Sequence, residues 1–303
     1  MSYTSTHKQL KTLTYTHFFK PDSMFNWRNI FTRAVAGIVY IAILLFGVLY
    51  NKYSFVAVFG VILVLALNEF FKLIEQKTPH LISKLFNIIS GIIIFISAYL
   101  FLNKITILAL PISALLYLLA LLVSAIVIDR KDIFNTIIYS AFGQLYITLP
   151  FCLLLLISYE YKMTNPIYHY AFVLAIFVFI WVNDTFAFAT GITMGKHKLL
   201  ERISPKKTIE GFVGGIIFTM LAGVAFSFIF TEYNIYFWVV FALIASLFAT
   251  LGDLFESLIK RTYNVKDSGH LIPGHGGILD RIDSLLFVIP AIYIYLLITN
   301  WFI

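Results

Sequence analysis

The sequence predicts an all-α, polytopic integral membrane protein with about nine transmembrane helices and a cytoplasmic N-terminus. Hydrophobic residues make up 60% of the 303 positions, and charged residues only 12%. A soluble domain of this size carries about 25% charged residues. The charges also cluster between long apolar runs. The only cysteine, Cys152, lies inside such a run, which excludes an intrachain disulfide and a zinc site built on thiolates.

The spans follow from the apolar runs, because a membrane-spanning helix needs about 20 mainly apolar residues. The polar segment 1–33 is not followed by a small-residue cleavage site, so we expect a cytoplasmic segment and a retained first span. We expect a five-span membrane region over 34–167 and a four-span catalytic region over 168–303. The predicted spans are 34–50, 53–71, 85–102, 106–127, 134–157, 168–190, 211–230, 236–256 and 285–301.

The orientation follows from the distribution of basic residues, which are enriched in cytoplasmic loops. With the N-terminus inside, only Lys52, Lys104 and Lys162 of the 22 Lys and Arg residues fall in outside loops. Both long connections, 191–210 and 257–284, then face the cytoplasm. The net charge of +7 is explained by this topology signal rather than by nucleic-acid binding.

Three carboxylates, Glu69, Asp184 and Asp253, stand near the ends of apolar runs, where a charge is costly and often functional. Their spans run from outside to inside in this topology, so all three approach the cytoplasmic side. One polar cavity open to the cytoplasm would satisfy them. The alternative is that each lies near an interface and is simply solvated, above all Glu69 beside Lys72.

The eighth predicted span carries a polar stripe. Four residues recur at i, i+3, i+4 and i+7, which places them on one helical face: Asp253, Glu256, Ser257 and Lys260. A polar stripe at the end of an apolar helix should line a cavity.

The first long connection contains Ser204-Pro205-Lys206-Lys207. This pattern predicts a helix with Ser204 as N-cap and Pro205 as its first residue. Positively charged side chains are unfavourable at a helix N-terminus, which itself carries partial positive charge. A bound anion would remove this conflict, so Lys206 and Lys207 indicate a phosphate site. The alternative is a basic loop that touches anionic headgroups.

The second long connection, 257–284, combines basic, acidic and glycine residues. Carboxylates beside basic residues suit a polyphosphate held with Mg²⁺, and glycines let the backbone approach a ligand closely. Zinc on His270 and His275 lacks a convincing third ligand. The basic residues are Lys260, Arg261, Lys266 and Arg281, the acidic ones Asp267, Asp280 and Asp283, and the glycines of interest Gly276 and Gly277.

The run Ser257–Asp283 resembles the signature of the phosphatidate cytidylyltransferases (CDP-diacylglycerol synthases). It reads S-x-x-K-R-x4-K-D-x-G-x3-P-G-H-G-G-x-x-D-R-x-D. The segments around Asp184, Gly191 and Gly195 and the stretches 204–211 and 252–257 are also similar to this family. The resemblance is close over about 170–303 and, before that, limited to an apolar, multi-span character.

The resemblance implies an enzyme that makes CDP-diacylglycerol and pyrophosphate from CTP and phosphatidic acid with Mg²⁺. It also implies a helical homodimer in the cytoplasmic membrane. Metal binding is implied for Asp253 and Asp280, and less directly for Asp184, Asp267 and Asp283. Ser257, Lys260 and Arg261 then belong to the substrate pocket.

Our hypothesis for the mechanism is that the lipid phosphate attacks the α-phosphorus of CTP. Its second pKa is about 6, so no strong general base is required. Basic groups and a metal must bring two anions together. We assign this work to Asp253, Ser257, Lys260, Arg261, Asp280 and Arg281, metal binding to Asp253, Asp280, Asp283 and Asp184, and substrate binding to Ser204, Lys206, Lys207, Lys266, Asp267, His275, Gly276 and Gly277.

Three other readings stay open. The first is the same chemistry on another lipid phosphate, such as a polyprenyl phosphate. The second is a transporter that uses Asp184 and Asp253 as an ion pathway, although the sequence shows no repeated halves. The third is a structural membrane protein, which would leave the clustering of acidic and basic residues unexplained.

Overall fold

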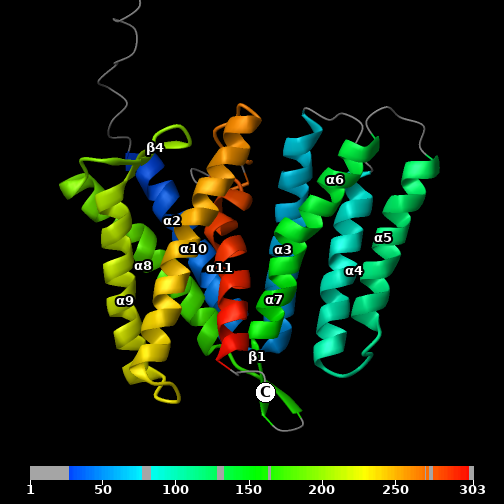
Figure 1. The fold of residues 1–303 in the computed structure, drawn as a ribbon, viewed down its shortest axis with the longest axis horizontal. Helices are drawn as coiled ribbons and strands as arrows, with labels where there is room; N and C mark the ends of the chain where they lie inside the picture. Colours follow the sequence, from blue (N-terminus) through cyan, green and yellow to red (C-terminus); the bar gives the residue numbers. More distant parts are fainter. Residues whose placement is uncertain are drawn as a thin grey trace, which may run out of the picture.

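The computed structural model consists mainly of long helices that run roughly side by side (Figure 1). It describes residues 27–76, 83–127, 133–162, 165–269, 271–272 and 276–299. The helices are α2 (Trp27–Leu49), α3 (Lys52–Glu75), α4 (Lys84–Leu102), α5 (Ala109–Val127), α6 (Ile133–Gly143), the π-helix η2 (Gln144–Thr148), α7 (Leu149–Ile157), α8 (Ala171–Met194), α9 (Ile209–Ile229), α10 (Ile235–Thr262) and α11 (Leu279–Ile298).

The predicted spans agree with these helices in order and position. Within the described ranges, eight helical segments are long and apolar enough to cross a membrane. They include Ile133–Ile157, where α6, η2 and α7 form one span. The first predicted span coincides with α2, whose apolar part Ala34–Leu49 is shorter. The polytopic, all-α fold is thus confirmed, while the ninth span and the side of the N-terminus stay predictions.

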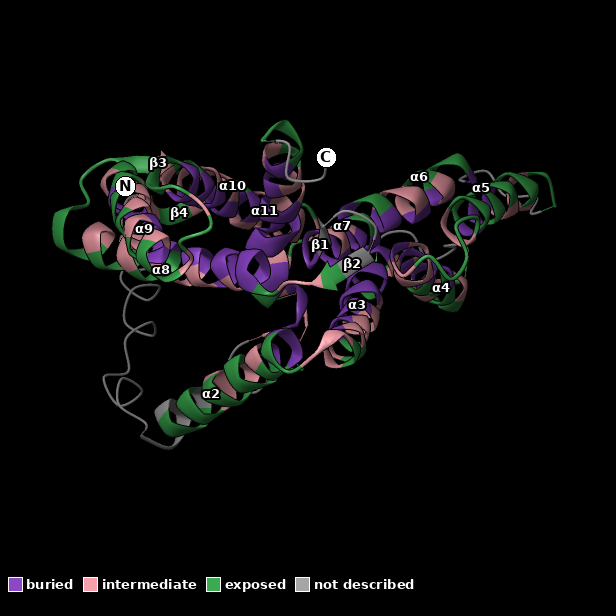
Figure 2. Cartoon of the chain, turned by 90° about the horizontal axis from the view of Figure 1, so that it is seen from below, coloured by how far each residue is buried: buried purple, intermediate pink, exposed green. Residues whose placement is uncertain are grey.

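The outer surface of the helices is apolar, as expected where lipid replaces water. Ile126 is 84% exposed and Phe228 76%. In Figure 2, α2 stands apart from the other helices and shows mainly exposed residues. The interior is a continuous cluster of Phe, Leu, Ile and Trp side chains from both halves of the chain.

Two short antiparallel hairpins, which the sequence does not predict, connect the helices at opposite ends of the molecule (Figure 1). One pairs β1 (Tyr159–Lys162) with β2 (Asn165–Tyr168). The other pairs β3 (Lys198–Leu200) with β4 (Ser204–Thr208), with partners Lys198 and Thr208 and partners Leu200 and Ser204. The second hairpin fills the first long connection and shapes one side of the site described below.

The first half contains a buried polar network. The Tyr117 hydroxyl donates to Asn87 Oδ1 (2.8 Å), and the Asn87 amide donates to Ser140 (3.2 Å). Gln144, the first residue of η2, donates to the Asn87 carbonyl oxygen at 2.7 Å. These bonds join α4, α5, α6 and η2, because a polar group in a bilayer must find its partner within the protein.

The four C-terminal helices pack as one group, and α11 also contacts α3 and α7 from the first half. The α10–α11 contact is close. A Cβ atom on Gly252 would lie 2.6 Å from the carbonyl oxygen of Asp283, so only glycine fits there. This contact brings the carboxylates of α10 and α11 to one place.

Candidate active site

An acidic cavity of about 260 Å³ lies where α8, α10 and α11 meet. All of its lining residues except Ser284 are residues that the sequence predicts for the site. The structure therefore brings together side chains from three helices and from the loop between α10 and α11. The lining residues are Asp184, Asp253, Lys260, Asp267, Asp280, Arg281, Asp283 and Ser284.

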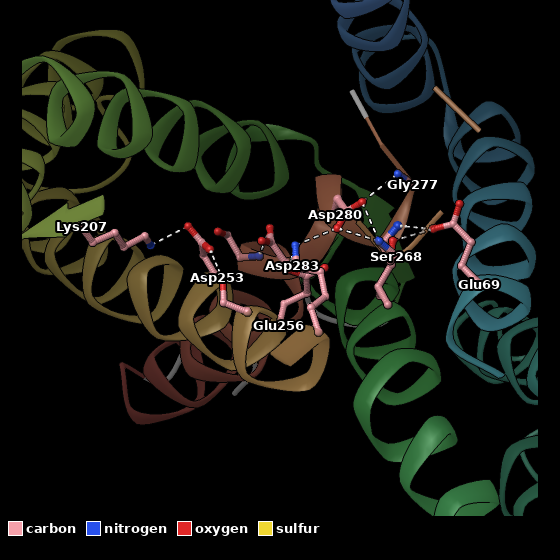
Figure 3. Close-up of polar contacts among 12 residues, drawn as sticks. Glu69, Lys207, Asp253, Glu256, Ser268, Gly277, Asp280 and Asp283 are labelled. Carbon is pink, nitrogen blue, oxygen red and sulfur yellow. Dashed lines mark hydrogen bonds and ion pairs between the residues drawn. The ribbon is translucent and has the colours of Figure 1, made fainter. Parts of the chain in front are cut away.

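Asp253 connects this cavity to the β3–β4 hairpin (Figure 3). Its Oδ2 atom lies 2.5 Å from Nζ of Lys207, on β4. Its Oδ1 atom accepts a hydrogen bond from the Ser257 hydroxyl at 3.3 Å. Both charged side chains are about one third exposed, so solvent and a substrate phosphate can reach the pair.

Lys260 lies between two carboxylates. Its Nζ atom donates to Asp280 Oδ1 at 2.9 Å and also forms an ion pair with Glu256, one turn earlier on α10. Glu256 is 1% exposed, and a carboxylate buried so deeply requires a cation partner. Of the four residues on the predicted polar face of α10, Asp253 and Lys260 line the acidic cavity, whereas Glu256 lies behind Lys260 as its buried ion-pair partner.

Asp280 organises the loop that precedes it. Its Oδ2 atom accepts the backbone N–H groups of Ser268 (3.0 Å) and Gly277 (2.8 Å). Gly276 has φ +86°, a left-handed conformation that favours glycine. Asp280 is therefore held by Lys260 on one side and by loop amides on the other.

The remaining carboxylates lie close enough to interact through their charges. The negative charges of Asp253 and Asp184 repel the Asp283 carboxylate. The Oδ1 atom of Asp283 accepts a hydrogen bond from the Ser284 N–H at 2.6 Å. The Asp184 carboxylate accepts a hydrogen bond from Asn183 at 3.4 Å. Such mutual repulsion favours a bound cation.

This donor set fits Mg²⁺, which prefers oxygen ligands and is often held by one or two carboxylates together with substrate phosphates and water. Within the part of the chain that the structure describes, no three His, Cys, Asp or Glu side chains form a ready-made metal cage. Asp253 and Asp283 line the cavity beside Asp184. Asp280 would have to exchange an N–H donor for a metal ion, because several donors already engage its oxygens.

A second cavity, of about 480 Å³, opens on the other side of Asp253. We call it the lysine cavity, because Lys206 and Lys207 line it together with Asp184 and Asp253. Much of the remaining lining is apolar, including Phe188 and Ile192, which are exposed side chains on a spanning helix. The lysine cavity therefore combines a cationic end with an apolar wall.

The prediction that Ser204 caps a helix is wrong. Ser204 lies in β4, and the N-cap of α9 is Thr208, whose hydroxyl accepts the Gly211 N–H at 3.1 Å. Strand pairing with β3 extends the chain through residue 208. Glu210 then fixes the hairpin, because its carboxylate accepts the N–H groups of Lys196 and His197.

Other predicted site residues lie further from the acidic cavity. Arg261 is exposed near the end of α10 and does not line the acidic or the lysine cavity. Lys266 lines a third cavity, of about 710 Å³, between α3 and the loop. Gly277 is buried against Ser268 rather than open to a ligand. His275 and the alternative zinc residue His270 lie outside the described residues.

Glu69 lines the third cavity and not the acidic one, so the expectation of a single cavity for all three intramembrane carboxylates is wrong. Its interpretation as a solvated interfacial residue is also wrong, since Glu69 is only 7% exposed. Its carboxylate accepts hydrogen bonds from Ser268 and Leu279. The position of Glu69 in an apolar run marked it as a candidate functional residue. No feature of the sequence marked Ser268 in this way.

Comparison with known proteins identifies similar chains. The profile of the cytidylyltransferase family matches residues 31–299, which include every described residue of the acidic cavity. A phosphatidate cytidylyltransferase from Staphylococcus saprophyticus is 47% identical over 141 residues, which cover 46% of this chain and 53% of the relative.

Two further phosphatidate cytidylyltransferases show the same extent of similarity. The protein from Staphylococcus haemolyticus is 44% identical over 156 residues, covering 48% of this chain and 58% of the relative. The protein from Staphylococcus aureus strain COL is 47% identical over 139 residues, covering 45% of this chain and 52% of the relative. The matches thus span about half the length of these relatives.

Proposed function

The chain belongs to the cytidylyltransferase family, and we propose that it transfers the cytidylyl group of CTP to phosphatidic acid in phospholipid biosynthesis. The products are CDP-diacylglycerol and pyrophosphate. The observation that supports this most directly is the acidic cavity, where carboxylates and basic side chains from α8, α10 and α11 meet next to the lysine cavity. The relatives carry the name of this activity, and this chain shares about half their length with them.

The reaction is a substitution at phosphorus. An oxygen of the lipid phosphate forms a bond to the α-phosphorus of CTP, and the bond from that phosphorus to the bridging oxygen of pyrophosphate breaks. The nucleophile is already mostly ionised at neutral pH, since the second pKa of a phosphate monoester is about 6. The protein therefore needs to align two anions rather than to remove a proton.

The basic residues of the site have separate roles in this proposal. Lys207 and Lys206 bind the phosphate of the lipid, whose acyl chains lie along the apolar wall of the lysine cavity. Lys260 and Arg281, in the acidic cavity, stabilise the charge of the triphosphate and of the leaving group. Binding of the lipid phosphate to Lys207 releases Asp253 from its ion pair.

Mg²⁺ would be held by Asp253 and Asp283, with Asp184 beside them and Asp280 as a further predicted ligand. When bound, it neutralises the phosphate oxygens and polarises the reacting phosphorus. The protein positions these carboxylates through the Asp253–Ser257 and Asp283–Ser284 hydrogen bonds. We further propose a homodimer in the bacterial cytoplasmic membrane, with the acidic cavity facing the cytoplasm, where CTP is available.

The test is release of pyrophosphate from CTP by the purified chain in detergent, with and without phosphatidic acid and Mg²⁺. We expect release only when both are present, together with formation of CDP-diacylglycerol. A polyprenyl phosphate in place of phosphatidic acid is the matched control for the lipid. Turnover with the polyprenyl phosphate alone would reassign the substrate, and transport of a solute without CTP turnover would contradict the proposal.

A further inference from the structure

Glu69 lies on α3, in the first half of the chain, yet its carboxylate contacts the loop that carries the site (Figure 3). Its Oε2 atom accepts the Leu279 N–H at 2.9 Å and the Ser268 hydroxyl at 3.1 Å. In the portion of the chain described here, Glu69 forms no ion pair. Hydrogen-bond donors from the loop and from α11 therefore stabilise this buried carboxylate.

The Leu279 contact lies at the start of α11. The first N–H groups of a helix have no partner within the helix, and the N-cap Ile278 offers no side-chain acceptor. Glu69 supplies the acceptor from another helix, and its negative charge suits the positive end of the helix dipole. Glu69 thus caps α11 from outside and fixes where the helix that carries Asp280 and Asp283 begins.

Two glycines allow this approach. A Cβ atom on Gly269 would lie 2.5 Å from Oε1 of Glu69, and one on Gly277 would lie 2.3 Å from Oε2. Real Cβ atoms do not approach oxygen so closely. A side chain at either position would have to displace the Glu69 carboxylate from its hydrogen bonds, which explains glycine at both positions without any ligand.

Ser268 transmits this contact to the acidic cavity. Its hydroxyl donates to Glu69, while its backbone N–H donates to Asp280 at 3.0 Å. Asp280 in turn binds Lys260. A series of hydrogen bonds thus runs from Glu69 on α3 through Ser268 and Asp280 to Lys260 on α10.

We propose that Glu69 is a positioning residue for cytidylyl transfer. It holds the loop and the first turn of α11 so that Asp280 and Lys260 face the reacting phosphates. The inference rests on the proposed function for its kinetic consequence and on the contacts above for its structural one. It also gives the first half of the chain a direct part in the site.

The test compares four purified variants. Glu69→Ala removes both hydrogen bonds, whereas Glu69→Gln keeps an oxygen for the Leu279 N–H and an amide that can donate to the Ser268 oxygen. Ser268→Ala removes one contact and leaves Glu69 in place. Glu75→Ala, on the last turn of the same helix, is the matched control, because Glu75 lines neither the acidic nor the third cavity.

Two readouts keep the structural and kinetic parts separate. Hydrogen exchange of the amides of residues 268–280 should accelerate in Glu69→Ala and stay unchanged in Glu75→Ala, whether or not CTP is turned over. The kcat of Glu69→Ala should fall about 10-fold to 100-fold, because a small displacement of a catalytic group is enough for such a loss. Glu69→Gln should keep most of the parent kcat, and Ser268→Ala should lie between them.

Three outcomes would overturn the proposal. Unchanged amide exchange in Glu69→Ala would show that the carboxylate does not hold the loop. Parent-like kcat with accelerated exchange would show that the loop contact has no catalytic consequence. A Glu69→Gln variant as inactive as Glu69→Ala would show that the hydrogen bonds to Leu279 and Ser268 do not carry the role of this residue. If Glu69→Ala does not fold, the Gln and Ser268→Ala variants still decide between these outcomes.

Discussion

The Nζ atom of Lys207 lies 2.5 Å from Oδ2 of Asp253, and this ion pair joins the β3–β4 hairpin directly to α10. Both residues line the lysine cavity, and Asp253 also lines the acidic cavity. A phosphate that binds Lys207 therefore competes with Asp253 for the same ammonium group. Binding of a substrate phosphate to Lys207 would therefore free the Asp253 carboxylate for another partner.

Replacement of Lys207 tests this coupling. We expect Lys207→Met to lower kcat/KM for phosphatidic acid about tenfold or more, because a charge-assisted contact to phosphate is lost. Lys198→Met is the control, since Lys198 is an exposed lysine of the same hairpin that does not line the lysine cavity. Equal losses in both variants, measured by CDP-diacylglycerol formation at several lipid concentrations, would contradict a specific role for Lys207.

Asp253 and Asp280 should respond differently to the same change. Asp253→Asn should lose Mg²⁺-dependent turnover about 100-fold or more, since a metal ligand contributes several kcal/mol to such a reaction. The unfolding temperature of this variant should equal that of the parent protein, because Asp253 is partly exposed and has few partners.

Asp280→Asn should lose both activity and stability. Its new amide group would face the ammonium group of Lys260 and the N–H groups of Ser268 and Gly277, and breaking a buried ion pair costs about 3–5 kcal/mol. Thermal unfolding of the two variants in detergent checks this difference. Equal unfolding temperatures would show that Asp280 does not organise the loop.

Gly277 should not tolerate a larger side chain. A Cβ atom there would lie 2.3 Å from both Glu69 Oε2 and Ser268 Oγ, so Gly277→Ala must displace at least one of these side chains and should lower kcat about tenfold. Gly60→Ala on α3 is the matched control. The nearest atom to its new Cβ would be Phe95 Cε1 at 3.6 Å, an ordinary contact, and turnover should stay at the parent rate.

The helix cap of α9 gives a prediction that separates the two candidate cap residues. Thr208→Ala should destabilise the protein by about 1 kcal/mol, the usual loss for a removed N-cap. Ser204→Ala should have almost no effect on unfolding, because Ser204 lies in a strand. Unfolding temperatures in the reverse order would restore Ser204 as the cap.

Helical periodicity explains why much of the acidic cavity could be predicted. The spacing of Asp253, Glu256 and Lys260 is a property of one helix, and the structure indeed places their side chains within one polar cluster. The order of the spans follows equally well from the apolar runs. These features are local in the sequence, so composition and periodicity are sufficient to find them.

The errors concern contacts between distant segments. Ser204-Pro205 matches the usual start of a helix, but pairing with β3 keeps the chain extended to Thr208, and the N–H groups of Lys196 and His197 donate to the Glu210 carboxylate. No local pattern reports these partners.

Glu69 illustrates the same limit on a larger scale. Its apolar surroundings mark it as unusual, whereas its hydrogen-bond partner Leu279 lies 210 residues further along the chain. Sequence periodicity relates residues within one helix or strand, so a single sequence cannot predict a contact between residues so far apart.

The separation of Glu69 and Leu279 has a consequence for biosynthesis. A ribosome adds Leu279 210 residues after Glu69, so Glu69 cannot bind the loop until the start of α11 has been synthesised. Contacts between such distant segments form slowly, because the intervening chain must first be ordered. During that interval the Glu69 carboxylate has neither Leu279 nor Ser268 as partner.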